Sequence, residues 1–219
     1  MKEYIKDLAD TNLFSGITPN EISGLLDCVH AKLVDYEKDE FILEEGNRTY
    51  DFGIILSGRA RAIKWDSTDR VIIITLLQKG SEIGVILAAS LDHKSPVSVQ
   101  AQEKVSILLI PFDYLLARCK KSCPCHERLL RNYINIVAEK GLLLHERMNC
   151  LLKPTVREKI MTYLMRVSCE KQSLDFVLPF NRNGMAEYLN VERSALSREL
   201  SNMKKDKVID YNKNSFRLL

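Results

Sequence analysis

The sequence of 219 residues lacks long apolar runs. No stretch approaches the roughly 20 apolar residues that a membrane-spanning helix needs. The first ten residues, MKEYIKDLAD, are too polar for a signal peptide. These absences predict a cytoplasmic protein without a membrane partner, whose six cysteines are reduced thiols.

Motifs for catalysis are also missing. The sequence has no nucleophile elbow and no phosphate-binding loop, and residues 30–111 hold no His-x-His pair of the kind that places a metal inside an enzymatic jelly roll. We therefore expect no enzyme and no catalytic residues.

Positive charge is scarce outside the C-terminal third. Residues 151–219 hold 13 Lys and Arg against 8 Asp and Glu, a net charge of +5, whereas the first 150 residues hold 19 against 21. A basic C-terminal third indicates an anionic partner for that part of the chain.

Three regions follow one another by pattern. Residues 1–27 are predicted to be helical, with Thr18 as an N-cap, Pro19 at the first helical position and Glu21 completing a capping box. From 30 to 111, β-branched runs such as FGIILSGRARAIKW and RVIIITLLQKG alternate with the turn glycines Gly46, Gly58, Gly80 and Gly84. Many short strands at near-regular spacing predict a β-barrel or jelly roll.

Residues 126–152 have the pattern of a long helix. Apolar residues form a heptad seam of two rows: Leu130, Val137, Leu144 and Leu151, and Ile134, Gly141 and Met148. Such a seam fits a helix packed on its own barrel or a helix paired with a second chain. A second apolar face of Tyr133, Ile136 and Leu143 leaves the seam free, so we favour a dimerisation helix.

The C-terminal third alternates short helices and strands. A helix capped by Thr155, the strand LDFVLPF, a helix capped by Asn183 and a helix over 192–209 precede a hairpin around residues 212–214. Two helices separated by a tight turn and followed by a hairpin predict a winged helix-turn-helix. The fold class is therefore α+β: a jelly roll, a long dimerisation helix and a winged helix-turn-helix.

The second of these helices has the composition of a DNA-reading surface. If Ala195 and Leu196 point inward, the outer face holds Arg193, Ser194, Ser197 and Arg198. Arginine bonds guanine edges and serine meets bases or phosphates, while Lys204 and Lys205, further along, are predicted to meet phosphates. The alternative is a solvated amphipathic helix in a protein–protein module without DNA binding.

Nearly the whole chain resembles the cyclic-AMP receptor / fumarate–nitrate regulator (CRP/FNR) family of bacterial transcription factors. The resemblance rests on LFSGITPNEISGLL, on YEKDEFILEEGNRTYDFGIILSGRARAI, on LLQKGSEIG and on VERSALSREL, whose Ser197-Arg198 is similar to the fumarate–nitrate branch. It implies an effector-sensing domain over 1–125, a dimerisation helix over 126–152 and a DNA-binding domain over 153–219.

The sequence departs from that family where cyclic AMP would bind. In the cyclic-AMP binders, a Gly-Glu pair is followed about nine residues later by Arg-Ser, and the Glu and Arg hold the ribose and the phosphate. Here Val85, Ser95 and Pro96 replace the Glu, Arg and Ser. Burying a phosphate without its cation is costly, and Lys94, one residue away, is no bidentate guanidinium. We predict no tight cyclic-AMP binding and an unknown effector at a pocket formed by Gly84, Val85, Lys94, Ser95, Pro96 and Tyr133.

Four soft ligands lie within CKKSCPCHER: Cys119, Cys123, Cys125 and His126. They suit redox sensing or a metal, but their spacing is not the C-x₂-C of zinc sites, and small half-buried thiols are the simpler interpretation. The iron–sulfur cofactor of the fumarate–nitrate branch uses an N-terminal cysteine cluster, and no cysteine precedes Cys28. The cofactor therefore stays unknown.

Together these features predict an effector-responsive homodimer that regulates transcription from a pseudo-palindromic site in double-stranded DNA. Half-sites would lie roughly 34 Å apart, and RNA polymerase is a further partner that the resemblance implies. The alternatives are a redox- or metal-sensing regulator of the same fold and a ligand-gated module without DNA binding.

Overall fold

The computed structural model describes residues 2–66, 71–117 and 123–219. The chain forms two compact units, residues 1–138 and 139–219. The long helix α5 (Pro124–Leu151) passes through the boundary. Each unit is described by itself below, and the three-part division expected from the sequence stays a prediction.

Short helices begin the first unit: η1 (Lys2–Tyr4), α1 (Ile5–Ala9), η2 (Asn12–Phe14) and α2 (Pro19–Cys28). The predicted capping box of α2 is confirmed. Thr18 Oγ1 accepts from the Glu21 backbone N–H at 3.4 Å, and the Glu21 carboxylate accepts from the Thr18 backbone N–H at 2.9 Å. Helix α2 therefore begins where the sequence predicts.

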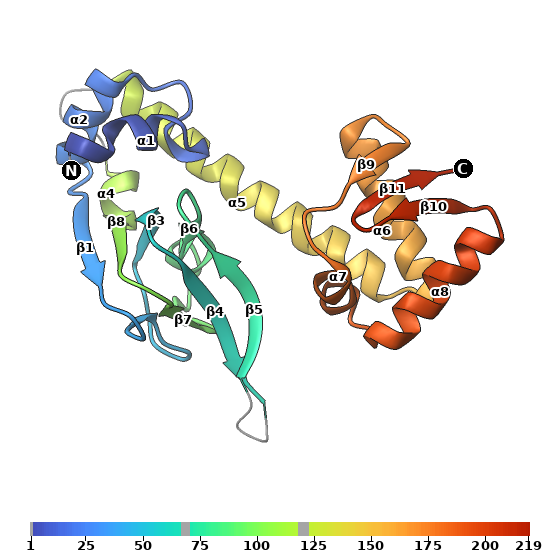
Figure 1. The fold of residues 1–219 in the computed structure, drawn as a ribbon. Helices are drawn as coiled ribbons and strands as arrows, with labels where there is room; N and C mark the ends of the chain where they lie inside the picture. The colour runs from blue at the N-terminus through green and yellow to red at the C-terminus, as the bar shows by residue number, and fades with distance from the viewer. Residues whose placement is uncertain (1, 67–70, 118–122) are drawn as a thin grey trace. The chain divides into compact units, whose positions relative to one another are not determined.

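Eight strands follow and make a jelly roll of two antiparallel sheets (Figure 1). One sheet has the order β1-β8-β3-β6 and the other the order β2-β7-β4-β5. The strands are β1 (Lys32–Tyr36), β2 (Phe41–Leu43), β3 (Asp51–Ser57), β4 (Ala60–Trp65), β5 (Val71–Leu77), β6 (Glu82–Ile83), β7 (Ser98–Ala101) and β8 (Val105–Pro111). The jelly roll predicted for residues 30–111 is confirmed.

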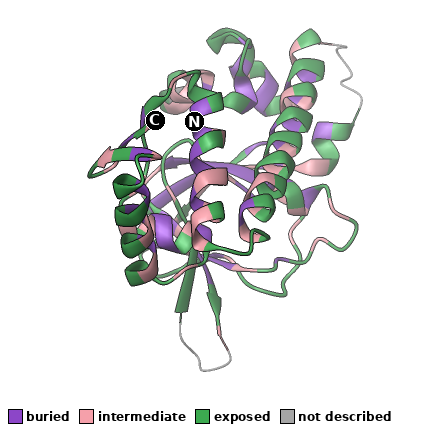
Figure 2. Cartoon of the chain, turned by 90° about the vertical axis from the view of Figure 1, so that its right-hand side faces the viewer, coloured by how far each residue is buried: buried purple, intermediate pink, exposed green. Residues whose placement is uncertain are grey.

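Strands β3 and β8 are buried on both faces, which explains their unbroken apolar sequences. Successive side chains of a strand point to opposite faces. Ile54 and Leu108 pack with the helices, whereas Ile55 and Ile107 pack between the two sheets. Figure 2 colours these strands mainly purple, the colour of buried residues.

Strand β5 is the edge of its sheet, next to β4. Except for Leu77, which is partly buried, its apolar side chains are between 44% and 66% exposed: Val71, Ile72, Ile73, Ile74 and Leu76. Two short helices complete the first unit with the start of α5: α3 (Val85–Ala88) and α4 (Phe112–Leu116).

The second unit is a winged helix-turn-helix. After α5 come α6 (Val156–Lys171), β9 (Asp175–Val177), α7 (Arg182–Leu189), α8 (Arg193–Lys205), β10 (Ile209–Asn212) and β11 (Ser215–Leu218). The strands form one antiparallel sheet in the order β10-β11-β9, so the hairpin β10–β11, called the wing below, is extended by β9. The α+β fold class predicted from the sequence is confirmed.

Helix α6 has Thr155 as its N-cap, as expected, and Glu158 completes a capping box. The expectation for α7 was wrong by two residues. Its N-cap is Asn181, whose side-chain oxygen accepts from the backbone N–H groups of Asn183 and Gly184 at 3.0 and 3.1 Å. Asn183 therefore lies inside the helix, because Asn181 already offers an acceptor with extended backbone.

Candidate DNA interface and effector region

Helix α8 has one buried face and one exposed face. Leu196, Leu200 and Met203 are fully buried and pack in the core of the second unit. These positions recur every three or four residues, which is the spacing of one face of a helix. Ser194, Ser197 and Arg198 lie on the exposed sides of the helix, and Arg193 is exposed at its first position.

A tight turn joins α7 to α8. Asn190 ends α7 in the left-handed conformation, with φ 49°, and its N–H bonds the carbonyls of Ala186 and Glu187. Asparagine tolerates this conformation better than most residues, and it turns the chain sharply. Met185 and Leu189 of α7 share the core with α8. Helix α7 therefore packs against the buried side of α8, and the polar residues of α8 stay exposed to solvent.

Lys204 and Lys205 lie on the last turn of α8 and are both exposed, but their surroundings differ. The Lys204 ammonium is 2.5 Å from an Asp210 carboxylate oxygen, 3.2 Å from the Tyr211 carbonyl and 5.2 Å from the centre of the Tyr211 ring. The hydrogen bond from Lys204 lowers the pKa of Asp210. Lys204 thus joins α8 to the wing, a contact that the sequence reasoning did not foresee.

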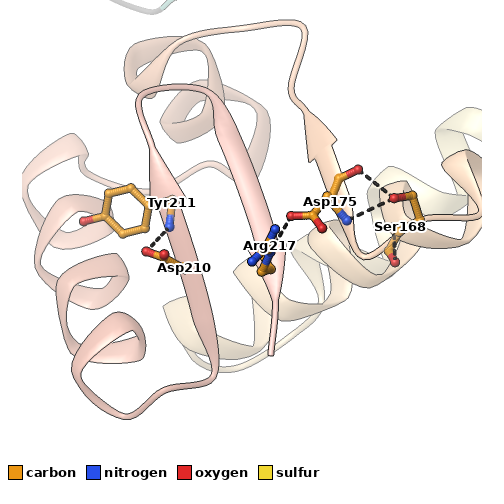
Figure 3. Close-up of polar contacts among 6 residues, drawn as sticks. Ser168, Asp175, Asp210, Tyr211 and Arg217 are labelled. Atoms are coloured by element: carbon orange, nitrogen blue, oxygen red, sulfur yellow. Dashed lines mark hydrogen bonds and ion pairs between the residues drawn. The ribbon is translucent and has the colours of Figure 1, made fainter.

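Ion pairs tie the wing to the rest of the unit. Arg217 of β11 contacts Asp175 of β9 at 2.5 Å (Figure 3), and Asp210 of β10 contacts Lys204 of α8. Within β10, the Asp210 carboxylate also accepts from the Tyr211 N–H at 2.7 Å. Each exposed pair contributes little by itself. With the sheet pairing of β11 and β9, they fix the orientation of the hairpin.

Sequence reasoning missed Arg182, the first residue of α7. Its guanidinium lies over two aromatic rings of the wing, 4.5 Å from the centre of Tyr211 and 5.0 Å from that of Phe216. Burial lowers the pKa of Arg182 below the usual arginine value. An alternation of aromatic and polar residues in the hairpin was visible in the sequence, but the partner on α7 was not, because only the fold brings them together.

In the first unit, the structure brings together two of the six residues of the predicted effector pocket. Tyr133 of α5 donates its hydroxyl to the Val85 carbonyl at 2.5 Å, and both side chains are buried. The Tyr133 ring also lies 4.6 Å from the Phe52 ring and 5.2 Å from the Phe112 ring. Desolvation raises the pKa of the Tyr133 hydroxyl. This contact fixes α5 to the start of α3.

No contact of the other pocket positions, apart from Gly84 next to Val85, with Tyr133 or Val85 is found among the described residues. Gly84 precedes α3 as its N-cap. Ser95 is buried and donates its hydroxyl to the Val97 carbonyl at 2.6 Å, whereas Lys94 and Pro96 are exposed. Lys94 pairs through its backbone with Arg48. The assignment of these six residues to an effector pocket stays a prediction.

The cysteine cluster is described only in part, since Cys119 lies outside the described residues. Cys123 and Cys125 are half-buried near the start of α5, and Cys125 packs against the core of the first unit. His126 is buried, and its Nε2 lies 2.9 Å from the Leu115 carbonyl oxygen. Within residues 2–66, 71–117 and 123–219, no three His, Cys, Asp or Glu side chains are grouped so as to hold a metal.

The fold and this surface define a class of protein: a jelly roll followed by a winged helix-turn-helix with exposed polar residues on its second helix. Two family models match in the same order. The cyclic nucleotide-binding domain matches residues 33–122, and the Crp-like helix-turn-helix domain matches residues 158–219. The chain belongs to the CRP/FNR family of transcription regulators and is a DNA-binding regulator with an effector-binding domain, not an enzyme.

Solved structures with the same fold include three bacterial proteins. A CooA mutant from Carboxydothermus hydrogenoformans is 20% identical, with 95% of this chain and 92% of that chain covered and a TM-score of 0.62. The regulator CLP of Xanthomonas campestris is 16% identical, with 90% and 98% covered and a TM-score of 0.57. FixK2 from Bradyrhizobium japonicum is 19% identical, with 86% and 92% covered and a TM-score of 0.52.

At these identities the likeness to the three structures shows the fold alone. No curated protein matches the chain by sequence. In the part of the chain that the structure describes, none of the helices combines the length and the apolarity needed to cross a membrane.

Proposed function

We propose that the protein acts as a homodimer on a pseudo-palindromic DNA site, and that an effector held by the jelly roll changes its DNA affinity. The observation that carries this proposal is the exposed apolar seam of α5. Within that seam, Ile134 is 57% exposed, Leu144 59% and Met148 48%. A heptad seam that stays open to water on a single chain suits pairing with the same seam of a second chain.

Part of α5 packs against the core of its own first unit. Tyr133 and Ile136 are buried in the core of the first unit, and Leu130 and Val137 pack partly against it. Tyr133 and Ile136 of the second apolar face, together with Leu130 and Val137 of the seam, therefore hold this part of the helix on its own domain. The seam stays open to a partner at Ile134, Leu144 and Met148. At Gly141, on the seam, an added Cβ would meet nothing within 4 Å, so this position leaves room for close approach of a partner helix.

A charged substitution in the seam tests whether the seam forms the dimer interface. Leu144→Glu places a carboxylate in the seam and is expected to convert dimers into monomers in sedimentation analysis. Leu142→Glu is the control. Leu142 is as exposed as Leu144, at 58%, but it lies outside the seam, about 100° around the helix axis from the seam residue Gly141. A dimer that survives Leu144→Glu, or dissociates equally with both variants, would contradict the proposed seam.

For DNA reading, the exposed face of α8 enters the major groove of one half-site on each protomer. Arg198 and Arg193 reach guanine edges, and Ser194 and Ser197 meet bases or phosphates. Lys205 is the better phosphate contact of the lysine pair, because the Lys204 ammonium is already engaged by the wing. The two half-sites lie roughly 34 Å apart.

The test begins by selecting bound fragments from genomic DNA, which yields the operator. Arg198→Ala should then weaken binding to that operator by about 1–3 kcal/mol and relax its base preference. Lys171→Ala is the control, since it removes an exposed charge from α6 of the same unit. Unchanged operator affinity in Arg198→Ala would show that α8 reads DNA in another register.

The effector is proposed to be other than cyclic AMP. At the positions compared with the cyclic-AMP binders, Val85 and Ser95 are buried and uncharged, and the Tyr133 hydroxyl is committed to a backbone carbonyl. A buried phosphate would find no cation on these residues. CLP, a protein of the same fold, is described as responsive to c-di-GMP, so the fold accommodates different effectors. Calorimetric titration with cyclic AMP should give no micromolar binding, and tight binding would refute this assignment.

Redox or metal sensing through Cys123, Cys125 and His126 is the alternative signal. One observation favours it: His126 Nδ1 is buried without a hydrogen-bond partner among the described residues, close in sequence to both thiols. If this alternative holds, diamide or Zn²⁺ changes the DNA affinity of the wild type and leaves that of the Cys123→Ser, Cys125→Ser double variant unchanged. Equal responses of the two proteins would exclude it.

A further inference from the structure

The last two turns of α5 belong to the second unit, and a cluster of charged and aromatic side chains joins them to α6 and α7. The second unit begins at residue 139, inside α5. Cys150, near the end of the helix, is only 1% exposed and lies in the core of this unit. The side chains of the cluster are Glu146 and Arg147 on α5, Tyr163 and Arg166 on α6, and Tyr188 on α7.

Arg147 connects α5 to α7. Its guanidinium carbon lies over the Tyr188 ring, 5.3 Å from the ring centre. The Nε atom of Arg147 is buried, and no carboxylate in the described part of the chain forms an ion pair with this arginine. A cation over an aromatic ring is held more strongly when it is desolvated, so the contact resists separation of α5 from α7.

Arg166 connects α6 to α5. Its guanidinium contacts the Glu146 carboxylate of α5 at 3.2 Å and the Glu170 carboxylate one turn further along α6. It also lies 5.3 Å from the centre of the Tyr163 ring. The Arg166 side chain is only 18% exposed. Solvent therefore weakens its attraction to Glu146 less than it weakens the attraction between exposed pairs.

Three aromatic rings form the floor of the cluster. The Tyr163 and Tyr188 rings lie 4.9 Å apart, and the Phe180 ring stacks on both with its centre 5.7 Å from each. Burial raises the pKa of the Tyr188 hydroxyl, and the positive charges of Arg166 and Arg147 oppose that rise. Both guanidinium groups therefore act on the same tyrosine.

The cluster fixes the end of α5 against the helix that supports α8. Met185 and Leu189 of α7 pack with Leu196 of α8 in one core, and Tyr188 lies on α7 between them. Movement of α8 relative to the end of α5 would have to carry Tyr188 away from Arg147. These contacts therefore hold the direction in which α8 points from the end of α5.

We propose that Arg147, Arg166 and Tyr188 are positioning residues that set the half-site spacing that the dimer accepts. The inference rests on the proposed function, because a distance between two α8 helices exists only in a dimer paired through α5. One extra base pair between the half-sites shifts one of them by roughly 3.4 Å and turns it by about 35°. To bind such a site, α8 must move relative to α5, and the cluster opposes this movement.

Arg147→Met is the direct test, because it removes the charge and keeps a long side chain over the Tyr188 ring. The matched control is Arg131→Met. Arg131 also lies on α5, but it is exposed and pairs with Glu127 of the same helix at 3.6 Å. In a second comparison, Tyr188→Leu removes the ring and the conservative Tyr188→Phe keeps it. Circular dichroism and thermal unfolding verify that the variants are folded.

Dissociation constants are measured for the selected operator, for the same operator with one base pair inserted at its centre, and for a duplex with a single half-site. Arg147→Met should lower the ratio of inserted to native dissociation constants by about 2- to 30-fold, the range that corresponds to losing one cation–π contact. Tyr188→Leu should lower it similarly, whereas Tyr188→Phe and Arg131→Met should keep the wild-type ratio. Affinity for the single half-site should be the same in Arg147→Met and the wild type.

An unchanged ratio in Arg147→Met would overturn the proposal, as would an equal decrease in Arg131→Met. A loss of half-site affinity in folded Arg147→Met would also overturn it, because the contact would then shape α8 itself and not its position. Failure of the proposed function gives a different result, since the wild type would then bind the native and the inserted operator equally.

Discussion

Gly58 lies in the tight turn between β3 and β4, and replacing it by alanine should destabilise the jelly roll strongly. Gly58 has φ 81°. An added Cβ would come within 2.2 Å of the Lys104 carbonyl oxygen and 3.0 Å of the Val105 Cα. Both atoms belong to backbone that enters β8, which is paired with β3 and cannot turn aside as a side-chain end can.

The expected loss has two parts. A left-handed backbone costs an L-residue about 1–2 kcal/mol, and forcing an extra carbon into packed surroundings typically costs about 1–3 kcal/mol. Gly58→Ala should therefore lower the free energy of unfolding by about 2–5 kcal/mol. Gly46→Ala separates the parts, because Gly46 has φ 83° but an added Cβ meets nothing within 4 Å. We expect a loss of only about 1–2 kcal/mol there.

The assay is guanidinium unfolding followed by tryptophan fluorescence. Trp65, the single tryptophan, lies at the end of β4 and so reports on the jelly roll. Linear extrapolation of the transitions gives the free energies. If Gly58→Ala and Gly46→Ala lose the same amount, the contact with the Lys104 carbonyl is not what requires glycine at position 58, and the reasoning from the structure fails.

Three further predictions use the same unfolding assay or simple chemistry. Tyr133→Phe should cost about 1 kcal/mol, because it removes the bond to the Val85 carbonyl and keeps the ring packing. Burial raises the pKa of Tyr133 above its ordinary value of 10.0. The stabilisation that the Tyr133 hydroxyl gives to the fold is therefore complete below pH 10 and falls as the pH rises further. The wild type should accordingly lose more stability above pH 10 than Tyr133→Phe. Iodoacetamide should modify exposed Cys169 before Cys150, whose thiol is buried with a raised pKa; equal rates by mass spectrometry would contradict this. Thr18→Ala should cost about 1 kcal/mol through loss of the α2 capping box, and unchanged stability would show that the box is dispensable.

Local signals in the sequence predicted a large part of this fold. The capping box at Thr18 and the N-cap at Thr155 depend on residues close together in the chain, and both formed where expected. The inward face of α8 follows from apolar residues at helical spacing, and Leu196, Leu200 and Met203 are buried accordingly. Periodicity identifies such faces because a helix buries one side against the core whatever the core contains.

Predictions failed or stayed open where several segments compete or meet. Asn183 was expected to cap α7, but Asn181 takes that role. The sequence predicted a strand over 71–77 but not its place, and the structure puts β5 at the edge of its sheet with most of its side chains exposed. Lys204 was expected to be a phosphate contact, and the structure joins it to Asp210. None of these outcomes follows from the local sequence alone.

By itself, the sequence determined the order of elements, the α+β class and the polar face of α8, since each depends on residues close together in the chain. Only the tertiary structure decided which side chains meet across long separations. It placed Arg182 on the rings of Tyr211 and Phe216, and it joined Tyr133 to Val85. Such contacts depend on the packing of distant segments, because the free energy of burying a cation or a hydroxyl is set by the partner that the fold supplies.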